Sequence, residues 1–169
     1  MLGKRFVQLF LCLLTTIGFG QEPNASLVKK MRKVVAQSFS EGQLQLEPVS
    51  DQLNYANGHL YPVLTTGQEL LGYAFLGYAP SKTDTFDYLV VFDSEFIIKN
   101  IKVLVYREDY GGEIGSKRWL RQFVGKNPEA SFEYGQNIAA ISGATISVQS
   151  MTRAVNSLLS NIHQSPLYQ

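Results

Sequence analysis

Two long stretches of the chain show the apolar periodicity of an amphipathic helix. From Leu27 to Phe39, apolar residues recur three or four positions apart, with cations clustered between them: Lys29, Lys30, Arg32 and Lys33. Near the other end of the chain, a stripe of the same spacing consists of Met151, Val155, Leu158 and Ile162. Such spacing puts the apolar side chains on one helix face. Four cations are few for stable adsorption to a membrane, so we interpret the basic cluster as a solvent-exposed face.

Three segments in the middle of the chain have the composition of β-strands. Residues 70–78, 86–92 and 96–106 are rich in aromatic and β-branched residues, and a turn at residues 93–95 separates the last two. Residues 42–67 have a broken pattern around Asn57-Gly58, which favours a hairpin or two short strands. No helical pattern interrupts the strands, so they predict an antiparallel meander in an α+β fold.

A glycine-rich loop follows the last predicted strand. Residues 107–116 contain three glycines in five positions, and the next segment, residues 117–123, has Trp119, Leu120 and Phe123 three and four positions apart. This spacing predicts a short helix with one apolar face. The expected order is therefore an N-terminal helix, the strand meander, the glycine-rich loop, the short helix and a C-terminal amphipathic helix.

The first twenty residues have the pattern of a secretory signal peptide. Lys4 and Arg5 precede an almost unbroken apolar stretch, and Gly18-Phe19-Gly20 provides small residues for cleavage before Gln21. The apolar stretch is short for a membrane span, which needs about 20 residues, so an uncleaved anchor is the weaker interpretation. We therefore expect an extracytoplasmic protein, in the periplasm or at the outer face of a membrane.

Cleavage would change the chemistry available to the chain. It would remove Cys12, the single cysteine, so the mature chain would form no disulfide and offer no thiolate. It would also remove two of the 15 basic residues and none of the 14 acidic ones, which leaves 13 against 14 and a formal charge of −1. This balance gives no indication of a nucleic-acid partner.

The sequence offers little for acid-base, nucleophilic or metal chemistry. The two histidines, His59 and His163, are far apart, and neither has a partner at ligand spacing. No nucleophile-elbow pattern surrounds any of the hydroxyl residues. We therefore predict no metal ligands and no catalytic residues.

Two loops remain as candidate binding sites. The first, residues 108–116, either supplies backbone freedom between a strand and a helix or lets the backbone approach a flat ligand closely. The second, Ser142-Gly143-Ala144-Thr145-Ile146-Ser147, begins the C-terminal helix. Free N–H groups and the positive end of the helix dipole attract phosphate at such a position. Ser142 or Ser147 could cap the helix or bind phosphate oxygens, and the Thr145 hydroxyl would then be an additional hydroxyl at a phosphate site. The alternative is an ordinary helix start with a redundant cap.

Residues 142–145, Ser-Gly-Ala-Thr, followed by an apolar residue, a serine and an amphipathic helix, resemble the flavin-attachment motif of the FMN-binding domain family. This family includes the C subunit of the sodium-translocating NADH:quinone oxidoreductase and the G subunit of the Rnf complex. The glycine-rich loop at residues 108–115 resembles a second family motif, which lies beside the flavin. The order of elements agrees from about Gly72 to about Ile162. With the predicted signal peptide at residues 1–20 set apart, the resemblance divides the rest of the chain into an N-terminal helix with short strands (21–67) and an FMN-binding domain (68–169).

The resemblance implies a role for each matched residue. Thr145 would carry FMN through a phosphoester bond, and Ser142, Gly143 and Ala144 would shape the turn around the phosphate. Three residues of the first loop would lie beside the flavin ring: Glu108, Gly112 and Gly115. The family motif usually has an aspartate three residues before its serine, and Ala139 occupies that position. FMN held without the ester is therefore the alternative to covalent attachment.

The function implied by the resemblance is that of an exported flavoprotein relaying electrons in an extracytoplasmic or membrane-associated redox chain. This role is favoured over a stand-alone enzyme that reduces a small molecule, because the sequence has no acid-base constellation. The partners of the flavoprotein would be a flavin transferase for maturation and redox proteins or a membrane quinone system. The alternative is a flavin-free module with the same fold that serves in binding or assembly, and Ala139 is the residue that favours it.

Overall fold

The computed structural model describes residues 24–47 and 57–168 and has the predicted α+β fold. Its elements are three α-helices, five strands and one short 3₁₀ helix: α1 (Ala25–Phe39), β1 (Leu44–Leu46), β2 (Gly58–Thr65), β3 (Leu70–Pro80), β4 (Thr85–Asp93), β5 (Ile98–Val105), η1 (Gly112–Gly115), α2 (Lys117–Leu120) and α3 (Thr145–His163). This order confirms the predicted helices and the meander, and it resolves residues 42–67 into two short strands, as far as they are described.

The five strands form one sheet in the order of the sequence, and every neighbouring pair is antiparallel. β2 and β3, on either side of residue 67, pair from Gly58 opposite Gly77 to Leu64 opposite Leu70. The central strands β3 and β4 carry long runs of buried residues because both faces of the sheet are covered. The division of the chain at residue 67 remains a prediction.

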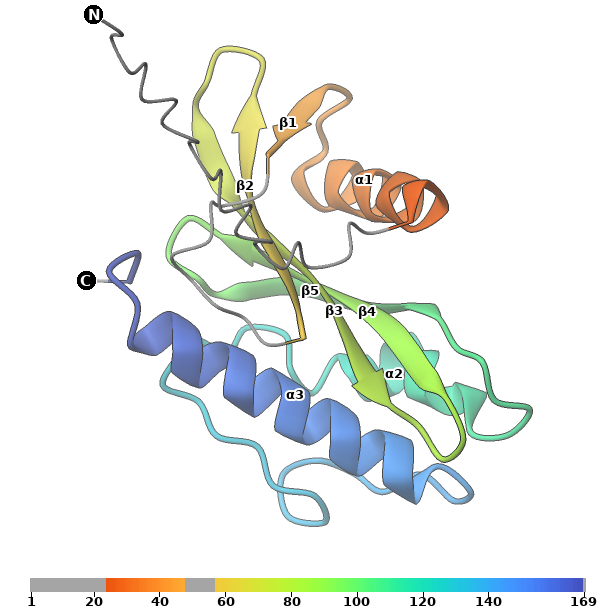
Figure 1. Ribbon diagram of the computed structural model, residues 1–169. Coiled ribbons are helices and arrows are strands. Elements are labelled where there is room, and N and C mark those ends of the chain that lie inside the picture. The colour runs from red at the N-terminus through yellow and green to blue at the C-terminus, as the bar shows by residue number, and fades with distance from the viewer. Residues whose placement is uncertain (1–23, 48–56, 169) are drawn as a thin grey trace, which may run out of the picture.

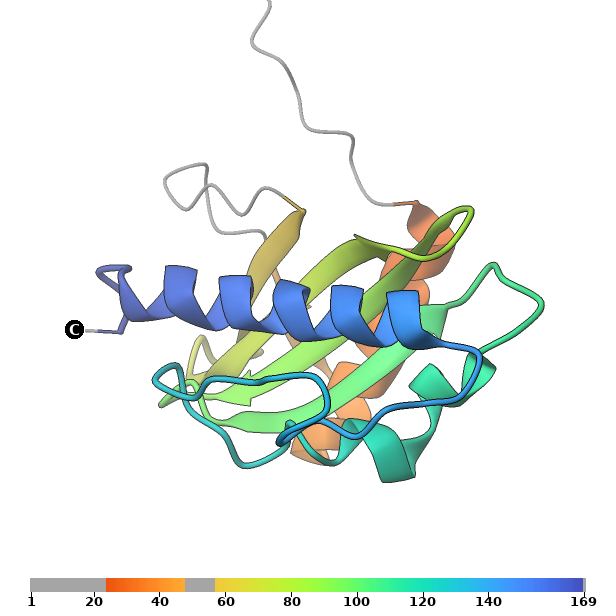
Figure 2. The ribbon, with the colours of Figure 1, turned by 90° about the horizontal axis from the view of Figure 1, so that it is seen from below.

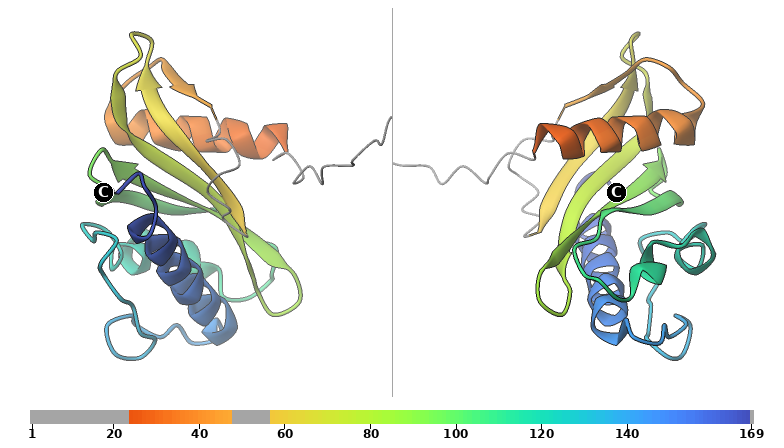
Figure 3. Two further views of the ribbon diagram at one scale, coloured as in Figure 1. Left: turned by 60° about the vertical axis from the view of Figure 1, so that its left-hand side comes forward. Right: turned by 90° about the vertical axis from the view of Figure 1, so that its right-hand side faces the viewer.

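A helix covers each face of the sheet. The two views of Figure 3 place α1 on one side and α3 on the other, and Figure 1 shows α2 on the side of α3. Under α1, Met31, Val34 and Val35 pack on one set of alternating strand residues. Under α3, the predicted stripe at positions 151, 155, 158 and 162 is buried against the other set. The amphipathic periodicity seen in the sequence thus positions both helices.

The strand predicted from residue 96 begins later, at Ile98, because Phe96 lies in the preceding turn. Its φ of 60° is in the left-handed region, which a strand does not use. The Asp93 carboxylate accepts the N–H groups of Glu95 at 3.0 Å and Ile97 at 2.9 Å, which holds the turn. The Phe96 ring stacks on Tyr73, with centroids 4.2 Å apart. Phe96 therefore contributes to the core from a turn.

Helix α2 is shorter than the helix predicted at residues 117–123, because it ends at Leu120. Beyond it, the N–H groups of Gln122 and Phe123 bond the carbonyls three residues back, at 3.2 and 3.1 Å, in the tighter turns that often end a helix. The apolar face survives this change, since Trp119, Leu120 and Phe123 are all buried.

The predicted signal peptide, with Cys12, lies outside the described residues. Of the helices in the described part of the chain, none combines the length and the apolar character that a membrane crossing requires.

Candidate functional site

The first turn of α3 leaves backbone donors without partners. Ala144 is the N-cap residue, no side chain caps the helix, and the Val148 N–H makes the first helical bond, to the Ala144 carbonyl at 2.9 Å. The N–H groups of Thr145, Ile146 and Ser147 precede that bond and have no acceptor in the described part of the chain. The suggestion that Ser142 or Ser147 caps the helix is therefore wrong. The open N-terminus, with its positive partial charge, can accept an anion.

A tight turn leads into this helix. The Ala144 N–H donates to the Ile141 carbonyl at 3.1 Å, and Gly143 within the turn has φ +79°, a conformation that favours glycine. A Cβ atom at Gly143 would meet nothing within 4 Å, so this side of the turn is open. Ser142, Gly143 and Thr145 are exposed while Ala144 is 3% exposed. The turn thus anchors its alanine in the core and presents the Thr145 hydroxyl to solvent, with no partner among the described residues.

The glycine-rich loop lies directly against this turn. Gly111 has φ +82°, and a Cβ atom there would stand 2.7 Å from the Ala144 Cβ and 3.0 Å from the Tyr106 hydroxyl. Any side chain at this position would push the two loops apart. Gly112 and Gly115, the predicted ring-side glycines, lie in η1, where an added Cβ would meet nothing or only Val103 at 3.8 Å. Gly111 is thus the glycine that the packing requires, and the sequence pattern alone does not distinguish it from Gly112 and Gly115.

A tyrosine joins the two loops through hydrogen bonds. The Tyr106 hydroxyl lies 3.1 Å from the Tyr110 carbonyl and 3.0 Å from Ser147 Oγ. A carbonyl can only accept, so Tyr106 donates its single proton to Tyr110 and accepts the proton of Ser147. Ser147 is 3% exposed, and this bond occupies its donor. The predicted site residue Ser147 therefore fixes the helix start to the glycine-rich loop.

Glu108, the third predicted ring-side residue, reaches to the turn between β3 and β4. Its carboxylate accepts the Ser81 hydroxyl at 2.6 Å, the Thr83 N–H at 2.7 Å and the Thr83 hydroxyl at 2.9 Å, with the Asp84 N–H at 3.3 Å. Ser81 and then Thr83 stabilise the charged form, which lowers the pKa of Glu108 to about 2. Glu108 thus ties the glycine-rich loop to the β3–β4 turn, and both of its oxygens are engaged there.

Ala139, at the position of the usual aspartate, has its backbone fixed from α2 and from the turn that follows it. The Trp119 Nε1–H donates to the Ala139 carbonyl at 2.8 Å, and the Ala139 N–H donates to Gln122 Oε1 at 2.7 Å. The Ala139 side chain is exposed. The structure therefore holds this backbone in place whichever short side chain it carries, and an aspartate at this position would reach solvent.

The two loops also carry two exposed apolar side chains. Tyr110 is 82% exposed on the glycine-rich loop, and Ile146 is 47% exposed next to Thr145. Tyr110 directly precedes Gly111, and Thr145 and Ile146 directly follow Ala144, so the contact between Gly111 and Ala144 brings these side chains to neighbouring parts of the surface. A free hydroxyl, unpartnered N–H groups and exposed apolar side chains together suit a ligand with a phosphate and a flat ring.

Both a family model and solved structures of known proteins match this chain. Residues 82–160 match the model of the FMN-binding domain family. Among solved structures, the crystal structure of Shewanella oneidensis NqrC has a similar fold, with a TM-score of 0.53 and 15% sequence identity over 79% of this chain and 94% of that chain. The comparison with curated proteins gives no significant match. The matched range contains both loops of the site, and it confirms the resemblance seen in the sequence, with FMN as the cofactor.

Proposed function

We propose that this chain, whose residues 82–160 form an FMN-binding domain, is an exported flavoprotein that relays electrons and holds FMN through a phosphoester to Thr145. The observation that carries the proposal is the start of α3. An exposed, unpartnered hydroxyl there adjoins three backbone N–H groups without acceptors.

The residues of the site fit a phosphate next to Thr145. The helix N-terminus supplies donors and a positive partial charge to phosphate oxygens. Gly143 leaves open space on the side of the turn that faces solvent, and the buried Ala144 keeps the hydroxyl of the next residue in a fixed position. An ester at Thr145 would also prevent loss of the cofactor by dilution outside the cytosol, which suits the predicted export.

The isoalloxazine ring of FMN, when bound, supplies one- and two-electron redox chemistry. The chain's own residues hold the two loops together and provide a surface for the ring. Gly111 allows the glycine-rich loop to contact the turn at Ala144, and the Tyr106–Ser147 hydrogen bond keeps that contact in register. Tyr110, on the same loop, offers an exposed aromatic face to a flat ring, a contact that aromatic pairs favour.

The proposed function also implies a location and redox partners for the chain. The predicted signal peptide would put the chain outside the cytosol, where a flavin transferase would attach FMN. Electrons would then pass between redox proteins or a membrane quinone system, with this chain as the intermediate carrier.

The second candidate function is a flavin-free binding or assembly module, and it is favoured by Ala139 at the position where the motif usually has an aspartate.

Intact-mass spectrometry and absorbance of the exported protein test the proposal. The protein is produced in cells that also make a flavin transferase, together with Thr145→Val, which keeps the side-chain shape and removes the hydroxyl. We expect a flavin spectrum and an added FMN mass that Thr145→Val abolishes. Ser160→Ala, which removes an exposed hydroxyl further along α3, is the matched control and should keep both signals. A colourless protein of unmodified mass that also fails to bind added FMN would leave the flavin-free module as the function.

A further inference from the structure

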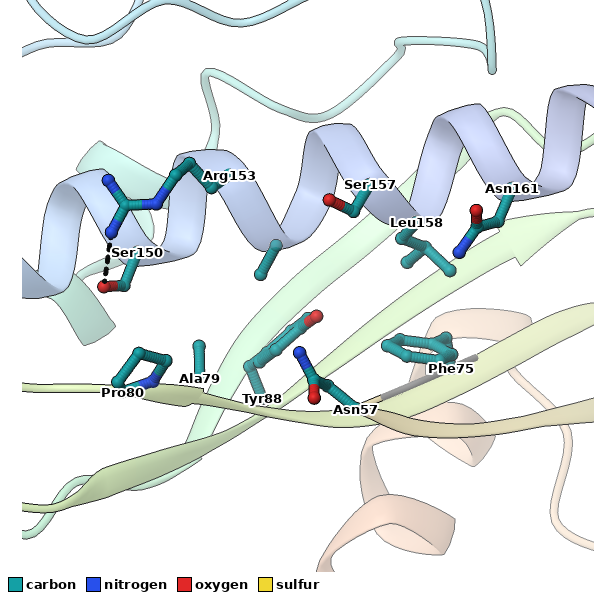
Figure 4. A pocket seen from close by; sticks show the side chains of 11 residues that line it. Asn57, Phe75, Ala79, Pro80, Tyr88, Ser150, Arg153, Ser157, Leu158 and Asn161 are labelled. Carbon is teal, nitrogen blue, oxygen red and sulfur yellow. Dashed lines mark hydrogen bonds between the residues drawn. The ribbon is translucent and has the colours of Figure 1, made fainter. Parts of the chain in front are cut away.

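A groove separate from the two loops runs along one side of α3. It has a volume of about 500 Å³ and lies between α3 and the strands β3 and β4. In Figure 4, α3 forms one wall, with Arg153, Ser157 and Asn161 along it, and Phe75 and Tyr88 form the floor from the sheet. Small-molecule sites typically have volumes of about 300–1,000 Å³. The groove is therefore of a size that can hold a small organic ligand.

The floor of this groove contains a buried hydroxyl without a partner. Tyr88 is 1% exposed, and its hydroxyl has no hydrogen bond within the described residues. Gly77 lies directly opposite on β3, and a Cβ atom there would come within 3.0 Å of the Tyr88 hydroxyl. The absence of that Cβ lets the ring lie over Gly77, which fixes where the hydroxyl points. A buried polar group of this kind normally has a partner, so this one is placed for a ligand atom.

The Tyr88 hydroxyl keeps its proton in this setting. Burial raises the pKa of the Tyr88 phenol well above its ordinary value, because the charged form would lose its hydration. The hydroxyl is therefore a donor as well as an acceptor across the physiological pH range. A carbonyl or hydroxyl oxygen of a ligand would satisfy it.

The rim of the groove carries one cation with no carboxylate partner. The Arg153 guanidinium donates to Ser150 Oγ at 3.2 Å and forms no ion pair with any described residue. The residues that line the groove, as far as the chain is described, include no aspartate or glutamate. Arginine pairs readily with a carboxylate through two parallel N–H bonds. A single cation beside an apolar floor favours a monoanion over a phosphate dianion.

We propose that the groove between α3 and strands β3 and β4 is a second binding site, which takes a planar aromatic carboxylate. The carboxylate pairs with Arg153, the flat ring system covers Phe75 and Leu158, and an oxygen substituent bonds the Tyr88 hydroxyl. Arg153 lies eight residues along α3 from Thr145, which is about 12 Å of helix. The site is distinct from the turn that precedes Thr145 and does not depend on whether FMN is attached.

Titration calorimetry with 6-hydroxy-2-naphthoate tests this site, because the probe carries a carboxylate at one end of a flat ring system and a hydroxyl at the other. We expect saturable binding to the purified protein with or without FMN, and weaker binding of the uncharged amide. Arg153→Gln should weaken binding of the carboxylate at least about tenfold and remove the preference over the amide. Arg118→Gln, which removes an exposed cation on α2, is the control and should leave binding unchanged.

Two further variants keep the test independent of folding. Tyr88→Phe removes the unpartnered hydroxyl alone, so we expect a stable protein that binds the probe several-fold more weakly. Ser157→Trp places a large side chain from an exposed helix position into the groove and should abolish binding. The proposal is overturned if the probe does not bind saturably, if Arg153→Gln binds like Arg118→Gln, or if FMN displaces the probe from Thr145→Val, since the groove would then be the place of the flavin ring itself.

Discussion

The contact between Gly111 and Ala144 gives the sharpest test of how the site is assembled. In Gly111→Ala, the new methyl group would stand 2.7 Å from the Ala144 Cβ while the backbone keeps φ +82°. A non-glycine residue in the left-handed region costs about 1–2 kcal/mol. Overpacking of a close contact adds about 1–3 kcal/mol. We therefore expect a loss of about 2–5 kcal/mol in the free energy of unfolding.

Gly135→Ala is the matched control for the backbone part of this cost. Gly135 has φ +81°, and a Cβ atom there would meet nothing within 4 Å, so its cost is about 1–2 kcal/mol. Urea unfolding of both variants, followed by circular dichroism, should show Gly111→Ala to be less stable than Gly135→Ala by about 1–3 kcal/mol. Gly111→Ala should also carry less FMN under conditions where it is folded. Equal stability of the two variants would refute the inference that this contact joins the loops.

Three further substitutions test individual contacts of the site. Ala139→Asp should change the free energy of unfolding by less than about 0.5 kcal/mol, because the side chain is exposed, and should raise the fraction of protein that carries FMN in the intact-mass assay; an unchanged fraction would contradict it. The pKa of Glu108 is lowered to about 2, so its stabilising effect is present above its unfolded pKa of about 4.3 and is lost as the pH falls towards 2. Glu108→Gln should therefore flatten the urea midpoint across that pH range, whereas the exposed Glu113→Gln should leave the wild-type profile. Tyr106→Phe should cost about 1–3 kcal/mol by leaving the buried Ser147 hydroxyl unpaired, and adding Ser147→Ala should recover part of the loss; additive effects in a double-mutant cycle would contradict the hydrogen bond.

The parts of the fold that follow from local periodicity could be predicted from the sequence. The apolar stripes gave both long helices, and the β-branched runs gave the central strands, because burial on a helix face or in a doubly covered sheet leaves a direct trace in the sequence. The predictions were wrong at the ends of two elements, the start of β5 and the end of α2. Phe96 has a strand-forming side chain but a left-handed backbone, and the sequence carries the side-chain preference without the turn geometry that overrides it.

In the candidate site, the position of residues that belong to one short motif could be predicted, and contacts between distant residues could not. Thr145 and its neighbours are contiguous, so their position at a helix start follows from the pattern. The partners of Glu108 lie 24, 25 and 27 residues away in the β3–β4 turn, and Tyr106 meets Ser147 across 41 residues. Three neighbouring glycines look alike in sequence, and only the approach of Ala144 distinguishes Gly111. Such contacts depend on tertiary packing, which single-sequence patterns do not encode.

The central claim is that the hydroxyl of Thr145 carries FMN, and peptide mapping tests it most directly. Trypsin should release residues 127–153 as one peptide, because Lys126 and Arg153 flank a segment without other lysine or arginine. For protein exported in the presence of a flavin transferase, we predict that this peptide gains the mass of FMN less one water and that fragment ions assign the gain to Thr145. An unmodified peptide, or a gain assigned to Ser142 or Ser147, would contradict the account.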